Sequence, residues 1–283
     1  MGRVTRQHTV LRLGPGLSVR RSDTVAVEEP LEVRLNGDAF VVTMRTPGDD
    51  IDLVHGLLHS EAVIADRQDV VTARYCDGVG PDGLNTYNVL DVTLEAGVAP
   101  PEPGARRNVL TTSACGVCGS TTIDTVMHES HHALDPDVRF DASVILSAPV
   151  RLREQQRTFD RTGGLHAAGL LTAEGRMLVV REDVGRHNAV DKVVGWAIRE
   201  QRLPLSRTIL AVSGRASFEL TQKAVLAGIP VLVAVSAPSS LAVELADEAG
   251  LTLVGFVRGD TMNVYTHQQR VVVGAELTAT ATP

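Results

Sequence analysis

The sequence predicts a mixed α and β protein, in which a small α+β domain precedes a larger domain built on a helix-covered mixed sheet. Three observations lead to this prediction. An Asn36-Gly37 pair separates two β-rich runs near the start of the chain. A Pro/Gly-rich break follows at 97–106. From residue 165 onward, short apolar runs alternate with amphipathic helical stretches, a pattern typical of helices packed over a sheet with some parallel strand pairs.

The first unit starts with two predicted strands, at 31–35 and 39–44. The Asn-Gly pair between them favours a hairpin, because glycine accepts a positive φ without steric cost. A helix is predicted over 51–64: Asp49 and Asp50 place carboxylates at its start, and its apolar side chains share one face. Strand-like runs at 70–76 and 86–94 complete the unit. We assign it residues 25–96, after an N-terminal extension at 1–24.

A linker with a cysteine-bearing loop is assigned to residues 97–125, the larger domain to 126–272 and a tail to 273–283, whose last residues, 278–283, are expected to be disordered. Within the larger domain, Ser217 is expected to cap its helix, and Gly228 and Gly250 are expected to end helices. Strands are predicted at 165–171, 177–180, 208–212, 230–235 and 251–257, and helices at 187–200, 217–228 and 240–250.

Composition limits the classes of function. Of 283 residues, 43% are hydrophobic but only 3% aromatic, so aliphatic side chains must build the core. The formal charge of −7 argues against non-specific binding to nucleic acid or to an anionic membrane, although it leaves room for a local basic pocket. No stretch approaches the roughly 18 apolar residues of a membrane span, and the start lacks a signal-peptide pattern. We therefore expect a cytoplasmic protein.

Two of the three cysteines form a CxxC motif, Cys115-Gly116-Val117-Cys118-Gly119. A thiolate is both a nucleophile and a sulfur acceptor, and the flanking glycines leave it sterically open. The second thiol can resolve a persulfide or tune its neighbour. Zinc ribbons, redox enzymes and sulfur carriers all use CxxC, and a plain interdomain linker is a further alternative. An odd number of cysteines does not indicate a disulfide framework.

Two sets of residues have a spacing that is close to that of known zinc sites. Cys115, Cys118, His128 and His132 give C-x2-C-x9-H-x3-H, but the middle segment is short for a zinc finger and the ββα pattern is missing. His59-Ser60-Glu61 together with the two cysteines imitates the H-x-E … P-C-x-x-C pattern of zinc deaminases, with Ala114 in place of the proline. We assign no metal ligand, and expect His128, His131 and His132 to form a solvated turn.

Two Gly-Arg turns follow predicted strands and open predicted helices: Gly185-Arg186-His187 and Ser213-Gly214-Arg215. Backbone N–H groups at a helix start and a guanidinium fork together bind anions. We expect the two turns to converge near one edge of the sheet, where ligands of α/β proteins bind. The alternative is a structural ion-pair network of Glu182 and Asp183 with the arginines. His166, a lone histidine in a strand, is expected to be a satisfied core residue.

A third polar stretch, Phe256-Val257-Arg258-Gly259-Asp260-Thr261, begins as the last apolar strand runs out, so a loop is expected there. Its Arg258 could bind phosphate, and Asp260 could accept hydrogen bonds from a base edge. The chain has no nucleophile elbow, Walker-type loop or GxGxxG motif, so the common hydrolase, NTPase and dehydrogenase hypotheses lack support.

Six stretches resemble the FdhD family of formate dehydrogenase accessory sulfurtransferases, in the family's order from about residue 25 to 272. They are NGDAFVVTMRTPGD, CGVCG, GGLHAAGL, EDVGRHNAVDK, SGRASFEL and LVGFVRGDTMNVYTH. Each stretch alone is only moderately specific for the family, but the six stretches in this order are very specific for it. Ala62 departs from the pattern, because the family often has glycine there.

The resemblance implies a C-terminal domain with a cytidine-deaminase-like fold but no deaminase activity. It implies that a cysteine desulfurase loads sulfur onto Cys115 as a persulfide, with Cys118 as an auxiliary thiol. The sulfur then passes to the molybdenum of a bis-molybdopterin guanine dinucleotide cofactor destined for formate dehydrogenase. The family's cofactor-binding stretch falls on Phe256 to Thr261, and its members are homodimers.

The physical interpretation adds Arg186, His187, Arg215 and Arg258 as candidate residues for the cofactor's phosphates. A non-catalytic cofactor-binding chaperone and a zinc-dependent deaminase-like enzyme are the alternatives. The thiols favour the carrier over the chaperone, because a protein that only binds the cofactor needs no thiol.

Overall fold

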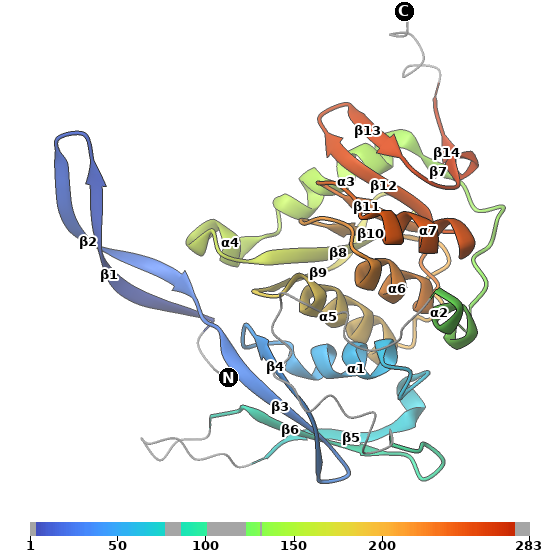
Figure 1. Ribbon diagram of the computed structural model, residues 1–283, viewed down its shortest axis with the longest axis horizontal. Coiled ribbons are helices and arrows are strands. Elements are labelled where there is room, and N and C mark those ends of the chain that lie inside the picture. Colours follow the sequence, from blue (N-terminus) through green and yellow to red (C-terminus); the bar gives the residue numbers. More distant parts are fainter. Residues whose placement is uncertain (1–3, 77–85, 101–122, 131, 275–283) are drawn as a thin grey trace, which may run out of the picture.

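The mixed α and β fold is confirmed, and its elements stack in layers (Figure 1). The computed structural model describes residues 4–76, 86–100, 123–130 and 132–274. A four-stranded sheet lies beneath helix α1, which packs on α5 of the next layer. Three helices, α5 to α7, then cover a six-stranded sheet, and α3 covers its other face. No helix in the described ranges is both long and apolar enough to cross a membrane.

The N-terminal sheet has the order β4-β3-β6-β5, with β3 and β6 parallel and the other neighbours antiparallel. Its strands are β3 (Glu29–Leu35), β4 (Asp38–Arg45), β5 (Val70–Tyr75) and β6 (Val89–Leu94). The predicted Asn-Gly turn is confirmed: Asn36 has a φ of 52° and Gly37 a φ of 90°. Asn36 Oδ1 also accepts a hydrogen bond from the Leu94 N–H, at 3.0 Å, which ties the turn to β6.

Helix α1 (Asp50–Ser60) covers this sheet but is shorter than the sequence predicts. It ends at Ser60 rather than near residue 64, because Ala62 adopts a left-handed φ of 54°. Glycine adopts this conformation without strain, whereas an alanine there has a steric cost. Asp49 occupies the N-cap position without a side-chain capping bond. The Asp50 carboxylate instead pairs with the buried Arg45, at 3.0 Å.

The N-terminal extension is a two-stranded arm, to which the sequence analysis assigned no element. β1 (Thr5–Gly14) and β2 (Leu17–Ala26) pair along their whole length. Pro15-Gly16 joins them, with Gly16 at a φ of 69°, as expected of a turn with proline followed by glycine. The arm stands clear of the rest of the chain (Figure 1), while at its root Arg161 Nη2 donates to Thr5 Oγ1 at 3.0 Å.

The six-stranded sheet has the order β13-β12-β11-β10-β8-β9, and only β10-β11 and β11-β12 are parallel. Its strands are β8 (His166–Thr172), β9 (Met177–Asp183), β10 (Thr208–Val212), β11 (Val231–Ala234), β12 (Thr252–Arg258) and β13 (Thr261–Val264). Its helices are α3 (Ala142–Arg153), α5 (Arg186–Arg199), α6 (Phe218–Leu226) and α7 (Ser240–Glu248).

The remaining elements are short. They are α2 (Ile123–Glu129), α4 (Arg157–Thr162), the paired strands β7 (Phe140–Asp141) and β14 (Val271–Val272), and 3-10 turns at Arg67–Asp69 and Gln268–Arg270. The helical stretches at 142–153 and 157–162 were not predicted from the sequence.

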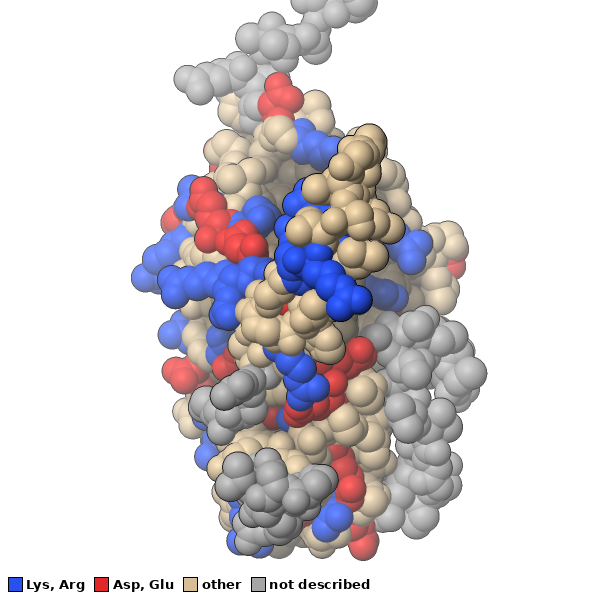
Figure 2. Space-filling model, turned by 90° about the vertical axis from the view of Figure 1, so that its left-hand side faces the viewer, with Lys and Arg blue, Asp and Glu red and all other residues tan. Residues whose placement is uncertain are grey.

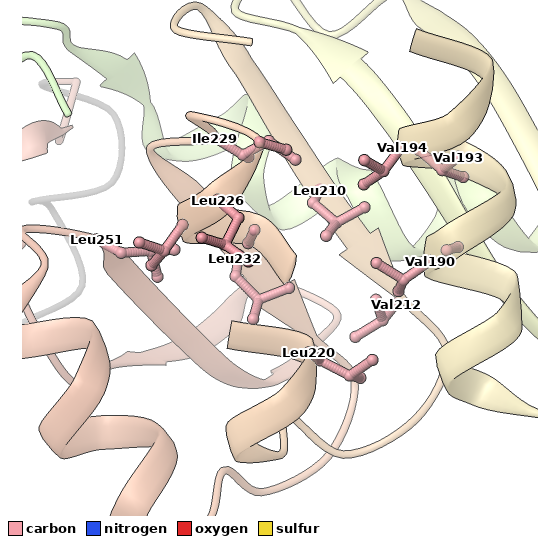
Figure 3. Packing of buried hydrophobic residues seen from close by; sticks show 14 of the residues in the cluster. Val190, Val193, Val194, Leu210, Val212, Leu220, Leu226, Ile229, Leu232 and Leu251 are labelled. Carbon is pink, nitrogen blue, oxygen red and sulfur yellow. The ribbon is translucent and has the colours of Figure 1, made fainter. Parts of the chain in front are cut away.

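The core is aliphatic, as the composition indicates. In Figure 3, Val190 and Val194 of α5 face Leu210 and Val212 of β10. Burying one such side chain contributes roughly 1.5–3 kcal/mol to folding. Helix ends follow the predicted glycines: Gly228 has a φ of 69° and Gly250 a φ of 76°.

The prediction that Ser217 caps α6 is wrong in one respect. Ser217 occupies the N-cap position, but its side chain makes no capping bond. Its hydroxyl instead lies 3.4 Å from His187 Nε2, at the start of α5.

The N-terminal unit meets the larger one where α1 crosses α5. The helices approach so closely that a Cβ at Gly56 would overlap the backbone of Asp191, and one at Gly195 that of Asp52. Buried ion pairs border this crossing: Arg181 with Asp52, Lys192 with Asp183 and Lys223 with Asp191, each at 2.7 Å. The crossing therefore anchors the small unit along α5, with Lys223 of α6 beside it.

Candidate functional site: a cationic edge of the sheet

The two Gly-Arg turns lie side by side at one edge of the six-stranded sheet, as expected from the sequence. β10 pairs with β8 so that Val212 faces Ala168, a register that brings Gly214 opposite His166. A Cβ placed on Gly214 would lie 3.7 Å from His166 Nδ1 and 3.8 Å from Arg186 Cδ. The turn after β10 therefore touches the turn after β9, with His166 between them.

The backbone of both turns can bind an anion. Helix α5 begins after Gly185 and α6 after Ser217, and neither helix has a side-chain cap on its first N–H groups. In α7, by contrast, Ser239 Oγ accepts a hydrogen bond from the Ala242 N–H, at 3.3 Å. Uncapped N–H groups carry the positive end of the helix dipole, so two such ends at one edge favour a bound anion.

Two arginines add formal charge at this edge. Arg186 is half-buried, Arg215 is exposed, and neither forms an ion pair with any residue of the described ranges. Figure 2 views the molecule from the side on which the β1–β2 arm projects (Figure 1), and it shows Lys and Arg side chains across the middle of that face, with Asp and Glu side chains beside and below them.

The acidic residues of the same motif have structural partners, so the ion-pair alternative holds for them but not for the arginines. Glu182 accepts hydrogen bonds from the N–H groups of Thr158 and Phe159, at 2.9 and 2.7 Å, at the start of α4. Asp183 is fully buried and pairs with Lys192 of α5. These carboxylates therefore leave Arg186 and Arg215 available to a ligand.

His187 links the starts of the two helices. Its Nε2 atom lies 2.9 Å from Glu219 Oε2 and 3.4 Å from Ser217 Oγ. A Ser-His-acid relay needs the acid on the other ring nitrogen. Because both partners contact the same nitrogen, this cluster is not a nucleophilic triad, and it joins the starts of α5 and α6.

The stretch from Phe256 to Thr261 is a hairpin rather than the expected loop. β12 continues to Arg258 and β13 starts at Thr261, so only Gly259 and Asp260 form the turn. The sequence prediction failed because the irregularity lies inside the strand: Phe256 has a φ of 53°, and the pairing register shifts between Gly255 and Arg258.

This hairpin shares the edge with the two turns. The Phe256 N–H donates to Ser236 O, at 3.3 Å, just beyond the end of β11, which in turn adjoins β10. The hairpin thus starts two strands from Arg215, roughly 10 Å at the usual strand spacing. Val257 is 3% exposed and packs in the core. The other five residues of the stretch, Phe256, Arg258, Gly259, Asp260 and Thr261, are exposed.

Cys115 and Cys118 lie outside the described residues, but the segments that flank them are placed. Val98 and Leu226 line the same cavity of about 190 Å³. On the other flank, α2 packs on α6, and His132 approaches Gly228. Both flanks therefore meet the C-terminal end of α6, whereas the Arg215 turn leads into its N-terminal end.

Both zinc hypotheses depend on these cysteines and lie outside the described residues with them. His59 is buried in α1 and Glu61 follows its end, while His128 is exposed on α2 and His132 is half-buried. Within the described ranges, no group of three or more His, Cys, Asp or Glu side chains could hold a metal ion.

His166 differs from its sequence-based prediction as a core residue. It is half-buried at the edge instead of satisfied in the core, and its ring makes no hydrogen bond to a described residue. Burial, together with the nearby Arg186 and His187, lowers the pKa of its imidazole. A histidine two residues after Gly163-Gly164, at the start of a strand, is the sequence signal for an edge position.

Comparison with known proteins identifies the family. The model of the FdhD/NarQ family matches residues 26–272. The chain belongs to the FdhD/NarQ family. Two relatives named sulfur carrier protein FdhD are those of Nocardia farcinica, 59% identical over 98% of this chain and 99% of the relative, and Mycolicibacterium paratuberculosis, 57% identical over 95% and 99%.

A crystal structure described as a formate dehydrogenase accessory protein from Desulfotalea psychrophila shares the fold. The two align with a TM-score of 0.73 at 24% identity, over 95% of this chain and 100% of the other. The FdhD/NarQ match covers both the cationic edge and the CxxC segment, and it begins where the N-terminal arm ends.

Proposed function

We propose that this chain carries sulfur as a persulfide on Cys115, from a cysteine desulfurase to the molybdenum of a bis-molybdopterin guanine dinucleotide cofactor for formate dehydrogenase. The observation that carries the proposal is the pair of uncapped helix starts with Arg186 and Arg215 beside them. A helix start is a suitable site for a phosphate group, so the pair suits a cofactor with two pyrophosphates. The name that the FdhD relatives bear, sulfur carrier protein, supports the same role.

In this proposal, sulfur is loaded onto Cys115 by exchange between its thiolate and the persulfide of the desulfurase. The Cys115 thiolate attacks the outer sulfur of the desulfurase persulfide. A new S–S bond forms on Cys115 as the S–S bond on the desulfurase breaks, and the desulfurase leaves as a thiolate. No external oxidant is consumed. In this scheme Cys118 serves as the auxiliary thiol.

The distances between the described parts are compatible with delivery by this segment. Helix α6 has nine residues and spans about 13 Å, and it separates the flanks of the cysteine segment from the Arg215 turn. Cys115 is eight residues before Ile123, and a chain of that length can extend to roughly 26–29 Å. A thiol carried on it can therefore serve a cofactor at the edge and a donor outside it.

Mass spectrometry tests the loading step. After incubation with a cysteine desulfurase and cysteine, the intact protein is expected to gain the mass of one sulfur atom, and to lose it on reduction. Cys118→Ala and the control Cys76→Ala should load as the wild type does, whereas Cys115→Ala should not. Equal loading of Cys115→Ala would remove that residue from the mechanism.

The same cofactor assignment predicts that GDP binds at the cationic edge. Arg215→Ala and Arg258→Ala should each weaken binding by roughly 1.5–3 kcal/mol, the usual value for a hydrogen bond to a charged group. Isothermal titration calorimetry measures the change. Arg176→Ala is the matched control, because Arg176 is exposed beyond the opposite end of β8. Binding that is unaffected by both edge variants would refute this location.

We further infer that the carrier works as a homodimer, and the arm supports this. Leu11, Leu13, Leu17 and Val19 of β1 and β2 are 44–69% exposed, on an arm that makes few contacts with its own chain. Residues 1–26 contain five arginines and one aspartate, a net charge of +4, so the other residues together carry −11. A second copy therefore offers the arm a surface of opposite charge. Sedimentation equilibrium measures the mass in solution.

A further inference from the structure

We propose that His166 is a ligand of the anion bound at the cationic edge, and that its imidazole takes up a proton when a nucleoside diphosphate such as GDP binds. The inference rests on the proposed function, because it takes the anion to be the diphosphate end of a guanine nucleotide. This role adds His166 to the residues that bind the anion, and it makes nucleotide affinity depend on pH.

The strand register fixes the position of His166. It pairs with Asp183 of β9 on one side and lies opposite Gly214, after β10, on the other. Residues that face each other across a ladder project to the same side of the sheet. The Asp183 carboxylate binds Lys192 of α5. The His166 side chain therefore projects to the α5 side, beneath the start of that helix.

The absence of a hydrophobic side chain at Gly214 keeps this space open. The nearest atoms to a Cβ placed there would be His166 Nδ1 at 3.7 Å, Arg186 Cδ at 3.8 Å and His166 Cε1 at 3.9 Å. One imidazole and one arginine stem thus border the same small volume. An anion at the start of α5 would meet both of them.

The His166 ring has no competing partner in the described ranges, unlike other partly buried histidines. His55 Nδ1 contacts the Ile51 carbonyl at 2.7 Å. His187 pairs with Glu219, and His267 Nε2 lies 2.8 Å from the Asp247 carbonyl. A half-buried imidazole without such a partner loses hydration, and a ligand oxygen would restore the missing hydrogen bond.

Charged groups face His166 from each element around it. Arg186 and His187 come from α5, Asp183 from β9, and Arg215 lies in the turn after β10. Burial first, then Arg186 and His187, hold the pKa of His166 below its usual 6.5, although Asp183 opposes them. Asp183 is already paired with Lys192. The free protein therefore has a neutral imidazole at neutral pH.

A bound diphosphate reverses this balance. Its negative charge offsets that of Arg186 and favours the imidazolium, so the pKa of His166 rises on binding. Between the lower pKa of the free protein and the higher pKa of the complex, binding takes up a proton. Affinity is then greatest at low pH and falls as pH rises through that interval, by at most about tenfold per pH unit for one proton.

Calorimetry of GDP binding in buffers of different ionisation enthalpy tests the proposal. Wild-type protein should take up a fraction of a proton near pH 7 that is absent in His166→Gln, which keeps a hydrogen-bond donor but cannot titrate. The affinity ratio of wild type to variant should grow by roughly threefold to tenfold per pH unit from pH 8 to pH 6. GDP's own titration cancels in this ratio. His8→Gln, at an exposed position of the arm, is the control.

The outcomes are distinct. Absence of GDP binding to the wild type would overturn the proposed cofactor site and this inference with it. Binding with equal proton uptake in wild type and His166→Gln would overturn the inference alone and leave the cofactor site standing. If the variant fails to fold, NMR of the wild-type imidazoles decides: the pKa of His166 must rise when GDP is added, and an unchanged value refutes the proposal.

Discussion

Cys115→Ala is expected to abolish restoration of formate dehydrogenase activity in a strain that lacks this protein, while Cys118→Ala leaves a substantial part of the activity. The family resemblance maps the sulfur-bearing position onto the first cysteine. Local electrostatics do not choose strongly between the thiols: Cys118 is the nearer in sequence to the start of α2, but it lies five residues before Ile123, and the effect of a helix dipole falls off within the first turn. For a sulfur carrier, the distance that the thiol can reach matters more than a low thiol pKa, because the desulfurase delivers the sulfur already activated.

Three other results would change the interpretation. The reverse pattern would move the persulfide to Cys118 and keep the sulfur carrier. Full activity without either thiol would favour the cofactor-binding chaperone, since the described residues of the cationic edge include no cysteine. Loss of activity in the control Cys76→Ala would place a needed thiol at the end of β5, outside the CxxC motif. The assay must compare variants at equal protein level, measured by immunoblot.

The elements that the sequence predicts well are those with local signals. The Asn36-Gly37 turn and the glycines that end α6 and α7 act through positive φ at single positions. The arm was missed although Pro15-Gly16 is also a turn signal, because its strands alternate irregularly and are exposed on both faces. Strands that are exposed on both faces lack the regular alternation of apolar and polar residues from which a strand is predicted.

The site was predicted in part for the same reason. The turns at Arg186 and Arg215 both follow the carboxyl ends of strands, and ligands of α/β sheets bind at that end. Their meeting could therefore be predicted from the sequence. The role of His166 depends on which strands are neighbours, since Asp183 and Gly214 approach it from opposite sides. Strand order is a property of the whole chain, and no local pattern contains it. The inward direction of Val257 likewise depends on the irregular backbone at Phe256.

Asp183→Ala is expected to lower the free energy of unfolding by about 3–5 kcal/mol, the usual cost of removing one partner of a buried ion pair. Asp183 is fully buried, and its Oδ2 lies 2.7 Å from Lys192 Nζ, which is itself 1% exposed. The same carboxylate accepts hydrogen bonds from the N–H groups of Thr46, at 3.1 Å, and Gly185, at 2.9 Å. The substitution thus leaves a buried cation unpaired and loosens the contact between the two units.

Urea unfolding followed by circular dichroism measures this loss, and two companion variants identify its origin. Asp160→Ala removes a surface partner of Arg153, whose pair has both side chains about half exposed, and should change stability by about 0–1 kcal/mol. Adding Lys192→Met to Asp183→Leu removes both charges, and should recover much of the stability because no unpaired charge remains. If the double variant is as unstable as Asp183→Ala, the hydrogen bonds to Thr46 and Gly185 carry the effect, and the ion pair with Lys192 does not.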